Sequence, residues 1–351
     1  MKFLICDILI RYFLIINGNT FFLICITYGV RKMRAILLIL LISSLVFCPS
    51  LENTSTYLSD TKPLVVTTTS VLASIVKDIA GDLVDVKYLV SPSMCPGHYD
   101  VKPGDIETIR SASLILAHGM EWAGWLRELI NSANQTGDLK VPIFNVTGPW
   151  NTPPLLKQKY TTVANLLIQT LGIDVESRLS RCLESIDTVD AELKEIANEY
   201  GFNNTPVVVM QWQMAFIKYL GFKIVASYGP PEFVSTQDII EIEENATLYG
   251  ARLVIDNLHS GVELGERIAK DVGAVHVVLL NFPEAVPGIK NVTDMMLYNA
   301  KILANALSEY GVRNKVSALQ EEISLWRSIS IAALVIIIIE SIVLVALVRR
   351  K

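Results

Sequence analysis

Three short apolar stretches in the second half of the chain are each followed by polar or aromatic side chains that could bind a ligand. They are 207–210 followed by Gln211-Trp212-Gln213, 252–255 followed by Asp256-Asn257-Leu258-His259, and 276–280 followed by Asn281-Phe282-Pro283-Glu284. If these stretches are parallel strands, their carboxyl ends share one edge of a sheet, where open α/β sheets bind ligands. The pattern therefore predicts a binding site at that edge.

The first half offers side chains with metal-ligand chemistry. Cys95 lies three residues before His98, in a loop that follows the apolar stretch 84–90. A thiolate combined with an imidazole favours zinc or copper over manganese. If the loops converge, Cys95, His98, Asp256 and His259 form a set of four ligands.

The same part of the molecule could instead hold a larger cargo. Amide groups and the rings of Trp150, Trp212 and Tyr228 suit a metal chelate or a small organic solute, held by hydrogen bonds and ring contacts. The side chains expected to line the cleft are His118, Gln211, Trp212, Trp150 and Glu232.

Each of these residues also has an explanation without a ligand. Asp256 would fit the N-cap of the next helix, Asn281 a turn, and His259 the edge of the cleft. Gln211 and Gln213 would satisfy backbone groups at the start of a helix. The residue types alone leave both explanations open.

The elements that must position these residues alternate between strand and helix. The first half predicts strands at 64–68, 84–90, 113–117 and 141–145, with helices at 71–80, 103–112 and 122–133. The alternation resumes at Val207 and ends near Tyr310. Alternating units of this kind predict mainly parallel sheets with flanking helices.

Between the two halves, residues 161–200 carry no strand pattern. Helical spacing is kept by Leu179, Leu183, Ile186, Val189, Leu193 and Ile196. We therefore expect one long helix after Gly172. The predicted fold class is α/β, with two lobes, each a mainly parallel sheet with flanking helices, joined by one long spine helix.

The carboxy-terminal end predicts a membrane anchor. Residues 329–348 form a 20-residue apolar run with one charge, Glu340. At about 1.5 Å per residue this run spans a hydrocarbon core of roughly 30 Å. The basic residues 349–351 follow directly, and the positive-inside rule places them in the cytoplasm. The sequence therefore predicts a single-pass cell-membrane protein with an extracytoplasmic body.

The amino-terminal end agrees with export. Arg31, Lys32 and Arg34 precede the apolar stretch 35–47, which is the pattern of a signal peptide, and Met33 could be the true start. The expected division is an export segment at 1–50, a polar tether at 51–62, an amino-terminal lobe at 63–170, the spine helix at 171–202, a carboxy-terminal lobe at 203–315, a juxtamembrane stretch at 316–328, the transmembrane anchor at 329–348 and a cytoplasmic basic tail at 349–351.

Charge and motifs exclude other classes. A formal net charge of -5 argues against a nucleic-acid partner. The sequence holds no nucleophile elbow, no His-Glu-x-x-His and no phosphate loop, so no enzyme is predicted. An exported body allows a disulfide between Cys95 and Cys182. His276 lies within a strand and is expected to pack.

Four stretches resemble the solute-binding proteins of zinc- and manganese-type ABC importers, the cluster with a helical backbone between two lobes. Within a match from about 63 to 307 they are 64–82 (LVVTTTSVLASIVKDIAGD), 97–106 (GHYDVKPGDI), 118–126 (HGMEWAGWL) and 215–221 (AFIKYLG). The resemblance implies a divalent metal ion of the zinc or manganese class as cargo.

The resemblance carries over the family's four metal ligands only in part. His98 falls on the first ligand, whereas the region of the second, 148–153, contains no histidine. The third and fourth ligands fall on Gln213 and Asn281. A set of this kind lacks anionic charge and would hold a hydrated divalent ion weakly.

The sequence thus predicts a membrane-anchored receptor that captures a metal ion or metal-containing solute outside the cell. The resemblance implies delivery to an ABC permease with its ATPase, with small movements of the lobes. The alternative is the same receptor role for a metal chelate, an oxyanion or a small organic solute. A melting temperature that rises with added metal would discriminate between them.

Overall fold

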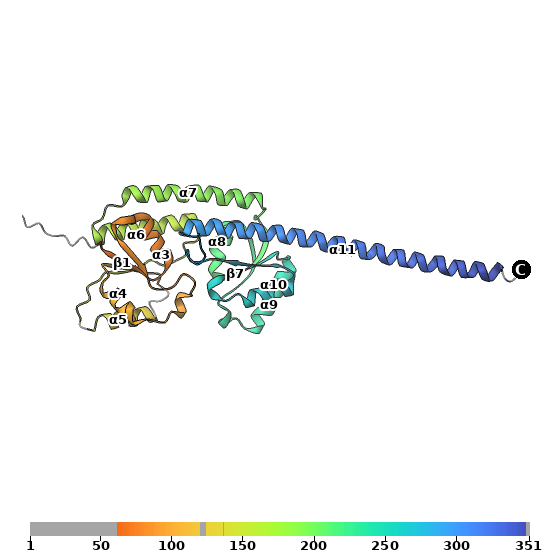
Figure 1. The fold of residues 1–351 in the computed structure, drawn as a ribbon, viewed down its shortest axis with the longest axis horizontal. Helices are drawn as coiled ribbons and strands as arrows, with labels where there is room; N and C mark the ends of the chain where they lie inside the picture. Colours follow the sequence, from red (N-terminus) through yellow and green to blue (C-terminus); the bar gives the residue numbers. More distant parts are fainter. Residues whose placement is uncertain (1–61, 120–123, 136, 349–351) are drawn as a thin grey trace, which may run out of the picture. The chain divides into compact units, whose positions relative to one another are not determined.

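The computed structural model describes residues 62–119, 124–135 and 137–348, which form two α/β lobes and a long carboxy-terminal helix (Figure 1). The export segment predicted at 1–50, the tether up to residue 61 and the basic tail at 349–351 lie outside these ranges. The predicted fold class is confirmed. The predicted lobe boundaries stay predictions.

The first lobe is built on a four-stranded parallel sheet with the order β2-β1-β3-β4. Its strands are β1 (Leu64–Thr67), β2 (Asp85–Tyr88), β3 (Leu114–Ala117) and β4 (Ile143–Asn145), with helices α3 (Ser70–Ala80), α4 (Pro103–Arg110) and α5 (Trp125–Ala133) and 3₁₀ turns η1 (Gly81–Leu83) and η2 (Pro96–His98). Strands that run parallel need such crossover connections, so their carboxyl ends all lie at one edge.

The second lobe repeats this plan with the order β6-β5-β7-β8. Its strands are β5 (Pro206–Met210), β6 (Lys223–Tyr228), β7 (Leu253–Asn257) and β8 (Val275–Leu279), with helices α8 (Met214–Tyr219), α9 (Thr236–Tyr249) and α10 (Glu263–Val272) and 3₁₀ turns η4 (Gln211–Gln213), η5 (Pro231–Phe233) and η6 (Leu258–Ser260). A capping box between Ser235 and Asp238 begins α9, and Gly250 in the left-handed conformation ends it.

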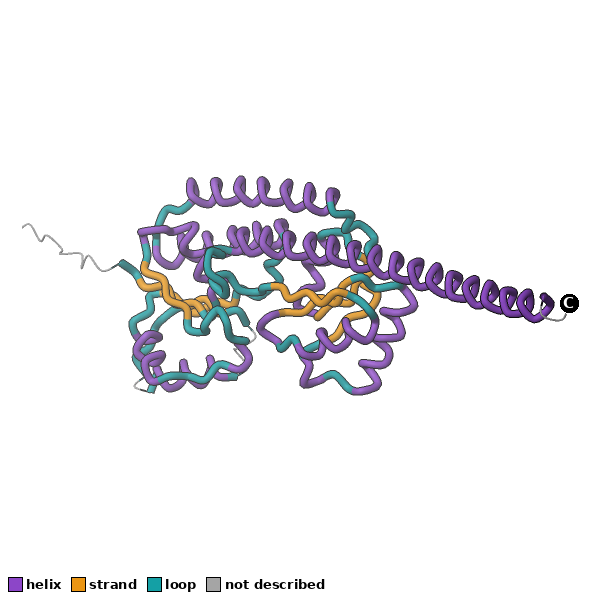
Figure 2. Tube along the Cα trace, turned by 45° about the vertical axis from the view of Figure 1, so that its right-hand side comes forward, coloured by secondary structure: helices purple, strands orange, loops and turns teal. Residues whose placement is uncertain are grey.

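Helices cover both faces of each sheet (Figure 2). In β5, Val207 and Val209 pack into the core on the side of the helical backbone, whereas Val208 and Met210 pack into the cluster that includes Ile242 of α9. Successive side chains of a strand point to opposite faces, so a strand that is buried on both faces needs a continuous apolar run.

The helical backbone contains more than the one predicted helix. The expected long helix is α7 (Glu176–Glu199), and α6 (Pro153–Leu171) lies beside it, as does the first part of the carboxy-terminal helix (Figure 1). Pro153 begins α6 and Gly172, in the left-handed conformation at φ 66°, ends it. The sequence analysis predicts no helix over 153–160, where α6 begins.

One hydrophobic cluster joins both lobes. It contains Val65 of β1, Tyr160 of α6, Leu193 of α7 and Val207 of β5, all at most 2% exposed. Because a close-packed core resists deformation, the two sheets share a common rigid support on this side.

The carboxy-terminal helix α11 (Val292–Val348) is continuous from the second lobe to the end of the apolar run. It has 57 residues, which gives a length of about 85 Å. Among the described residues it is the helix that is long and apolar enough to cross a membrane, with a mean hydropathy of 2.0 over its most apolar 18-residue window.

Candidate functional site

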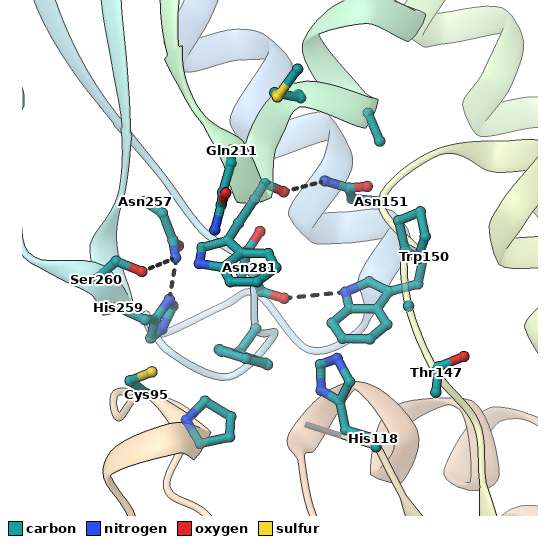
Figure 3. Close-up of a pocket in the computed structure, with 18 residues that line it drawn as sticks. Cys95, His118, Thr147, Trp150, Asn151, Gln211, Asn257, His259, Ser260 and Asn281 are labelled. Carbon is teal, nitrogen blue, oxygen red and sulfur yellow. Dashed lines mark hydrogen bonds between the residues drawn. The ribbon is translucent and has the colours of Figure 1, made fainter. Parts of the chain in front are cut away.

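A cavity of about 550 Å³ is lined by residues that follow the carboxyl ends of strands from both sheets (Figure 3). The second lobe contributes Gln211 after β5, His259 after β7 and Asn281 after β8. The first lobe contributes His118 after β3 and Trp150 after β4. The cavity therefore lies at the edge that the spacing of the sequence predicted.

His118 forms part of the wall on the side of the first lobe. Its side chain is buried, and its ring contacts Trp150 edge-on with 4.0 Å between ring centroids. Burial, and secondarily the charge of Lys159, lowers the pKa of His118 to about 3. The imidazole is therefore neutral at physiological pH.

His259 closes one end of the cavity by contacting both lobes. Its Nε2 lies 2.7 Å from the carbonyl oxygen of Pro92 in the first lobe, and its Nδ1 lies 3.3 Å from Oδ1 of Asn257. Burial lowers the pKa of His259 to about 4, although the bond to Pro92 opposes this shift. Since a carbonyl only accepts, the neutral ring carries its proton on Nε2.

Hydrogen bonds between side-chain amides, an indole and backbone oxygens connect the residues around the cavity. Nε2 of Gln213 donates to Oδ1 of Asn281 at 2.9 Å, and Nε1 of Trp150 donates to the backbone oxygen of Asn281 at 3.4 Å. Nδ2 of Asn151 donates to the backbone oxygen of Trp212 at 3.3 Å. Two of these three bonds join the first lobe to the second.

Two buried acceptors in this network have no hydrogen-bond partner among the described residues. They are Oδ1 of Asn151, whose residue is 4% exposed, and Oε1 of Gln213, whose residue is fully buried. Asn151 lines the cavity. An acceptor that is buried without a partner is costly, which is typical of a group that a ligand satisfies.

The predicted set of Cys95, His98, Asp256 and His259 is not assembled. Cys95 and His259 line the cavity, but the side chain of His98 is 72% exposed and lies 3.9 Å from Glu232. The short turn η2 buries Pro96 and leaves His98 outside the cavity. Glu232, predicted to line the cleft, is also exposed and is not part of the cavity wall.

Asp256 lies on the opposite face of β7 from the cavity. Asn257, the next residue, lines the cavity, and the alternation of a strand turns Asp256 away from it. The buried carboxylate accepts from Tyr228 at 2.6 Å and lies 2.7 Å from Nε2 of His276. Gly265 of α10 leaves the room for this group, because a Cβ there would meet the carboxylate at 1.9 Å.

This arrangement corrects two further expectations. Tyr228 does not line the cavity. Burial, and secondarily the charge of Asp256, raises the pKa of its hydroxyl. His276 pairs with a buried carboxylate rather than only packing in its strand. Cys95 and Cys182 are both free thiols, so the predicted disulfide between them is absent.

Asn151, Asn257 and Phe282 line the cavity but are not among the side chains that the sequence analysis expects to line the cleft. Successive side chains of a strand point to opposite faces, so Asn257 and its neighbour Asp256 in β7 cannot both face the cavity. This alternation is the signal that could have identified Asn257 as a lining residue. Phe282 follows a buried strand and contacts the rings of His118 and His259 with centroid separations of 6.4 and 4.8 Å. Residues 120–123 of the stretch 118–126, which include Glu121, lie outside the described residues.

The described residues contain no group of three or more His, Cys, Asp and Glu side chains that could hold a metal ion. The predicted ligands Gln213 and Asn281 do lie together, but they bond to each other. Amides are neutral, and zinc is held in proteins by His, thiolate or carboxylate. This donor set does not fit a bare zinc ion.

The family model described as the periplasmic zinc-uptake complex component A matches residues 65–306. The chain therefore belongs to this family of ABC-importer solute-binding proteins, as the sequence motifs had indicated. Proteins of this class bind solutes and are not enzymes.

Two curated relatives are similar over part of their length. The metal ABC transporter substrate-binding lipoprotein SsaB of Streptococcus sanguinis is 35% identical over 103 residues, which are 28% of this chain and 33% of SsaB. The manganese ABC transporter substrate-binding lipoprotein PsaA of Streptococcus pneumoniae is 36% identical over 88 residues, covering 24% and 28%. The chain thus spans about a third of these relatives.

Solved structures share the fold over a larger part of the chain. The periplasmic zinc-binding protein TroA of Treponema pallidum aligns with a TM-score of 0.58 at 19% identity, covering 70% of this chain and 99% of TroA. The laminin-binding protein Lmb of Streptococcus agalactiae, described as an adhesin with metal-transporting activity, aligns equally well at 19% identity. At these identities the likeness establishes the fold alone.

Proposed function

We propose that the chain is the membrane-anchored, extracytoplasmic receptor of an ABC importer, which captures a metal ion or a metal-containing solute in the cavity between its lobes. The observation that carries this proposal is a cavity of about 550 Å³ at the strand ends of both sheets, in a chain of the zinc-uptake family. Its partners are an ABC permease with a cytoplasmic ATPase.

The cargo is proposed to be metal-bearing because the similar proteins SsaB and PsaA are named for metal and manganese transport. The oxyanion alternative receives no support from the wall, because the described residues that line the cavity include neither lysine nor arginine. The apolar run at the end of α11 is proposed to hold the receptor at the membrane, with the body outside the cell.

The shared hydrophobic core supports a mechanism of small movements. Three polar contacts tie the loop after β8 to the first lobe, namely Ser70 to the backbone oxygen of Pro283 at 2.8 Å, and Lys77 and Tyr88 to Glu284 at 2.9 and 3.0 Å. Cargo entry then requires local rearrangement at the cavity rather than wide opening of the lobes.

The gene should be disrupted in its source organism, and washed cells grown under metal limitation should be analysed for their elements. We expect the content of one divalent metal, zinc or manganese, to fall several-fold and to be restored by the intact gene. Unchanged contents of every divalent metal would contradict the proposal.

A further inference from the structure

The described part of the cavity wall carries no net charge. The described residues that line it include no Asp, Glu, Lys or Arg. Its two histidines, His118 and His259, are neutral at physiological pH because burial lowers the pKa of each. A cargo that enters this space therefore meets no opposite charge.

A bare divalent ion is disfavoured in such a space. It would have to give up its hydration shell without anionic ligands to replace it, and desolvation of a charge without compensation is costly. No group of three metal-binding side chains lies among the described residues to provide that compensation.

Three large aromatic rings, those of Trp150, Trp212 and Phe282, contribute to the wall. Trp150 and Phe282 lie with their ring centroids 6.4 Å apart, and the ring of His118 lies 6.4 Å from Phe282. Trp212, which is 40% exposed, lines the cavity from the second lobe. Ring faces of this kind pack well against flat apolar surfaces.

Among the polar side chains of this wall, one has a buried acceptor that a ligand could satisfy. Oδ1 of Asn151 is a buried acceptor on the wall with no hydrogen-bond partner among the described residues. Its Nδ2 is held by the backbone oxygen of Trp212, which fixes the amide's orientation. A ligand N–H or O–H would satisfy this oxygen.

We infer that the cargo is an uncharged solute with a ring-sized apolar face and an N–H or O–H donor. This inference rests on the proposed receptor function and narrows its cargo. A metal-free organic molecule and an uncharged metal complex share this chemistry. A metal would therefore enter only as part of such a complex, never as the bare ion.

The test is calorimetry on the full chain in detergent micelles, with probes of matched shape and different charge. Indole is the uncharged probe with an N–H, indoleacetate is its anionic relative and tryptamine its cationic relative. Zinc chloride and manganese chloride represent the bare ions. Zinc pyrithione represents an uncharged metal complex that presents the ring face without an N–H or O–H donor.

Indole is expected to bind at least roughly tenfold more tightly than either charged relative, a factor of ten being about 1.4 kcal/mol. Neither metal salt should show saturable binding. If indole binds and zinc pyrithione does not, the cargo is a metal-free organic molecule. If zinc pyrithione binds, the cargo is an uncharged metal complex. Failure of both uncharged probes, or equal binding of the charged relatives, overturns the inference.

Two variants test the named groups. Trp212→Ala should weaken indole severalfold, since the exposed ring can be removed without opening the core. Asn151→Leu should abolish the preference of the chain for indole over N-methylindole, which lacks the donor. Phe233→Ala is the matched control, because this ring is 80% exposed and lies outside the cavity wall. An indole preference that survives in Asn151→Leu would contradict the assigned acceptor.

The outcomes separate this inference from the proposed function. Tight binding of zinc or manganese chloride would overturn the uncharged cargo while the receptor role stands. Unchanged metal contents in disrupted cells would overturn the proposed capture of a metal or metal-containing solute, whereas the inference of an uncharged cargo would still stand on the binding of indole.

Discussion

Asp256 and Asn257 are neighbours in β7 that face different environments, because Asp256 lies in a buried hydrogen-bond network and Asn257 lines the cavity. Replacing Asp256 with Asn removes the charge opposite His276 and weakens the bond from Tyr228. We expect a loss of about 2–3 kcal/mol in the free energy of unfolding, since the group is fully buried. Ligand binding in the cavity should not change.

Thermal unfolding and calorimetry with indole check this prediction together. Asp271→Asn is the matched control, because this carboxylate is exposed and lies 3.7 Å from Arg267 on the same helix face. Its effect should stay within about 0.5 kcal/mol. A loss of indole binding in Asp256→Asn without any loss of stability would place Asp256 in the binding site after all.

His118 makes the stability of the protein depend on pH. Its pKa is about 3 in the folded chain against an ordinary value of 6.5, so the unfolded chain binds more protons between these values. The stabilisation is complete above pH 6.5 and is lost as the pH falls toward 3, by roughly 1.4 kcal/mol per pH unit.

His118→Phe keeps a ring against Trp150 and removes the titration, so the slope of the unfolding free energy between pH 6 and pH 4 should become shallower. Urea unfolding at a series of pH values measures the slope. His98→Gln is the control, since that ring is exposed and its loss should leave the slope unaltered. An identical slope in His118→Phe would show that the buried imidazole is already charged.

At the scale of elements, the strand-and-helix alternation and the long spine helix could be predicted because apolar periodicity alone determines them. The site could be predicted only to the correct edge of the sheets. Asp256 was placed in the cleft because residue type suggested a ligand, whereas the phase of β7 decides which way it points. His98 was misplaced because the turn η2 buries Pro96, and no periodicity predicts the direction of an irregular loop.

Asn299 connects α11 to the loop that carries Asn281 and Phe282. Its Oδ1 accepts from the backbone N–H of Leu280 at 3.0 Å, and its Nδ2 donates to the backbone oxygen of the same residue at 2.8 Å. Asn299 is 1% exposed, so Asn299→Ala leaves two buried backbone groups of Leu280 without these partners. We expect a loss of about 2–4 kcal/mol.

Thermal unfolding of Asn299→Ala measures this loss, and indole calorimetry should show weakened binding because Phe282 is no longer held. Asn305→Ala is the control on the same helix, since Asn305 is exposed. If both variants melt at the temperature of the wild type, the bonds of Asn299 do not position the loop.

At the scale of the whole molecule, one hydrophobic cluster, two sheets and a single continuous helix connect the cavity to the apolar run proposed as the membrane anchor. The same α11 that holds Leu280 through Asn299 continues without a break into the apolar run. Under the proposed anchoring, this helix fixes the cavity relative to the membrane along its axis, which suits the proposed receptor role.

The anchor itself is tested by ending the chain after Ser328. The apolar window of α11 is entirely exposed, with a mean hydropathy of 2.0, and nothing in the described part of the chain covers it. The truncated protein should therefore move from the carbonate-washed membrane fraction to the soluble fraction. Glu340→Leu is the control, since removing a carboxylate that costs about 2–3 kcal/mol in lipid should keep the protein in the membrane. Membrane retention of the truncated chain would assign anchoring to residues before 62 instead.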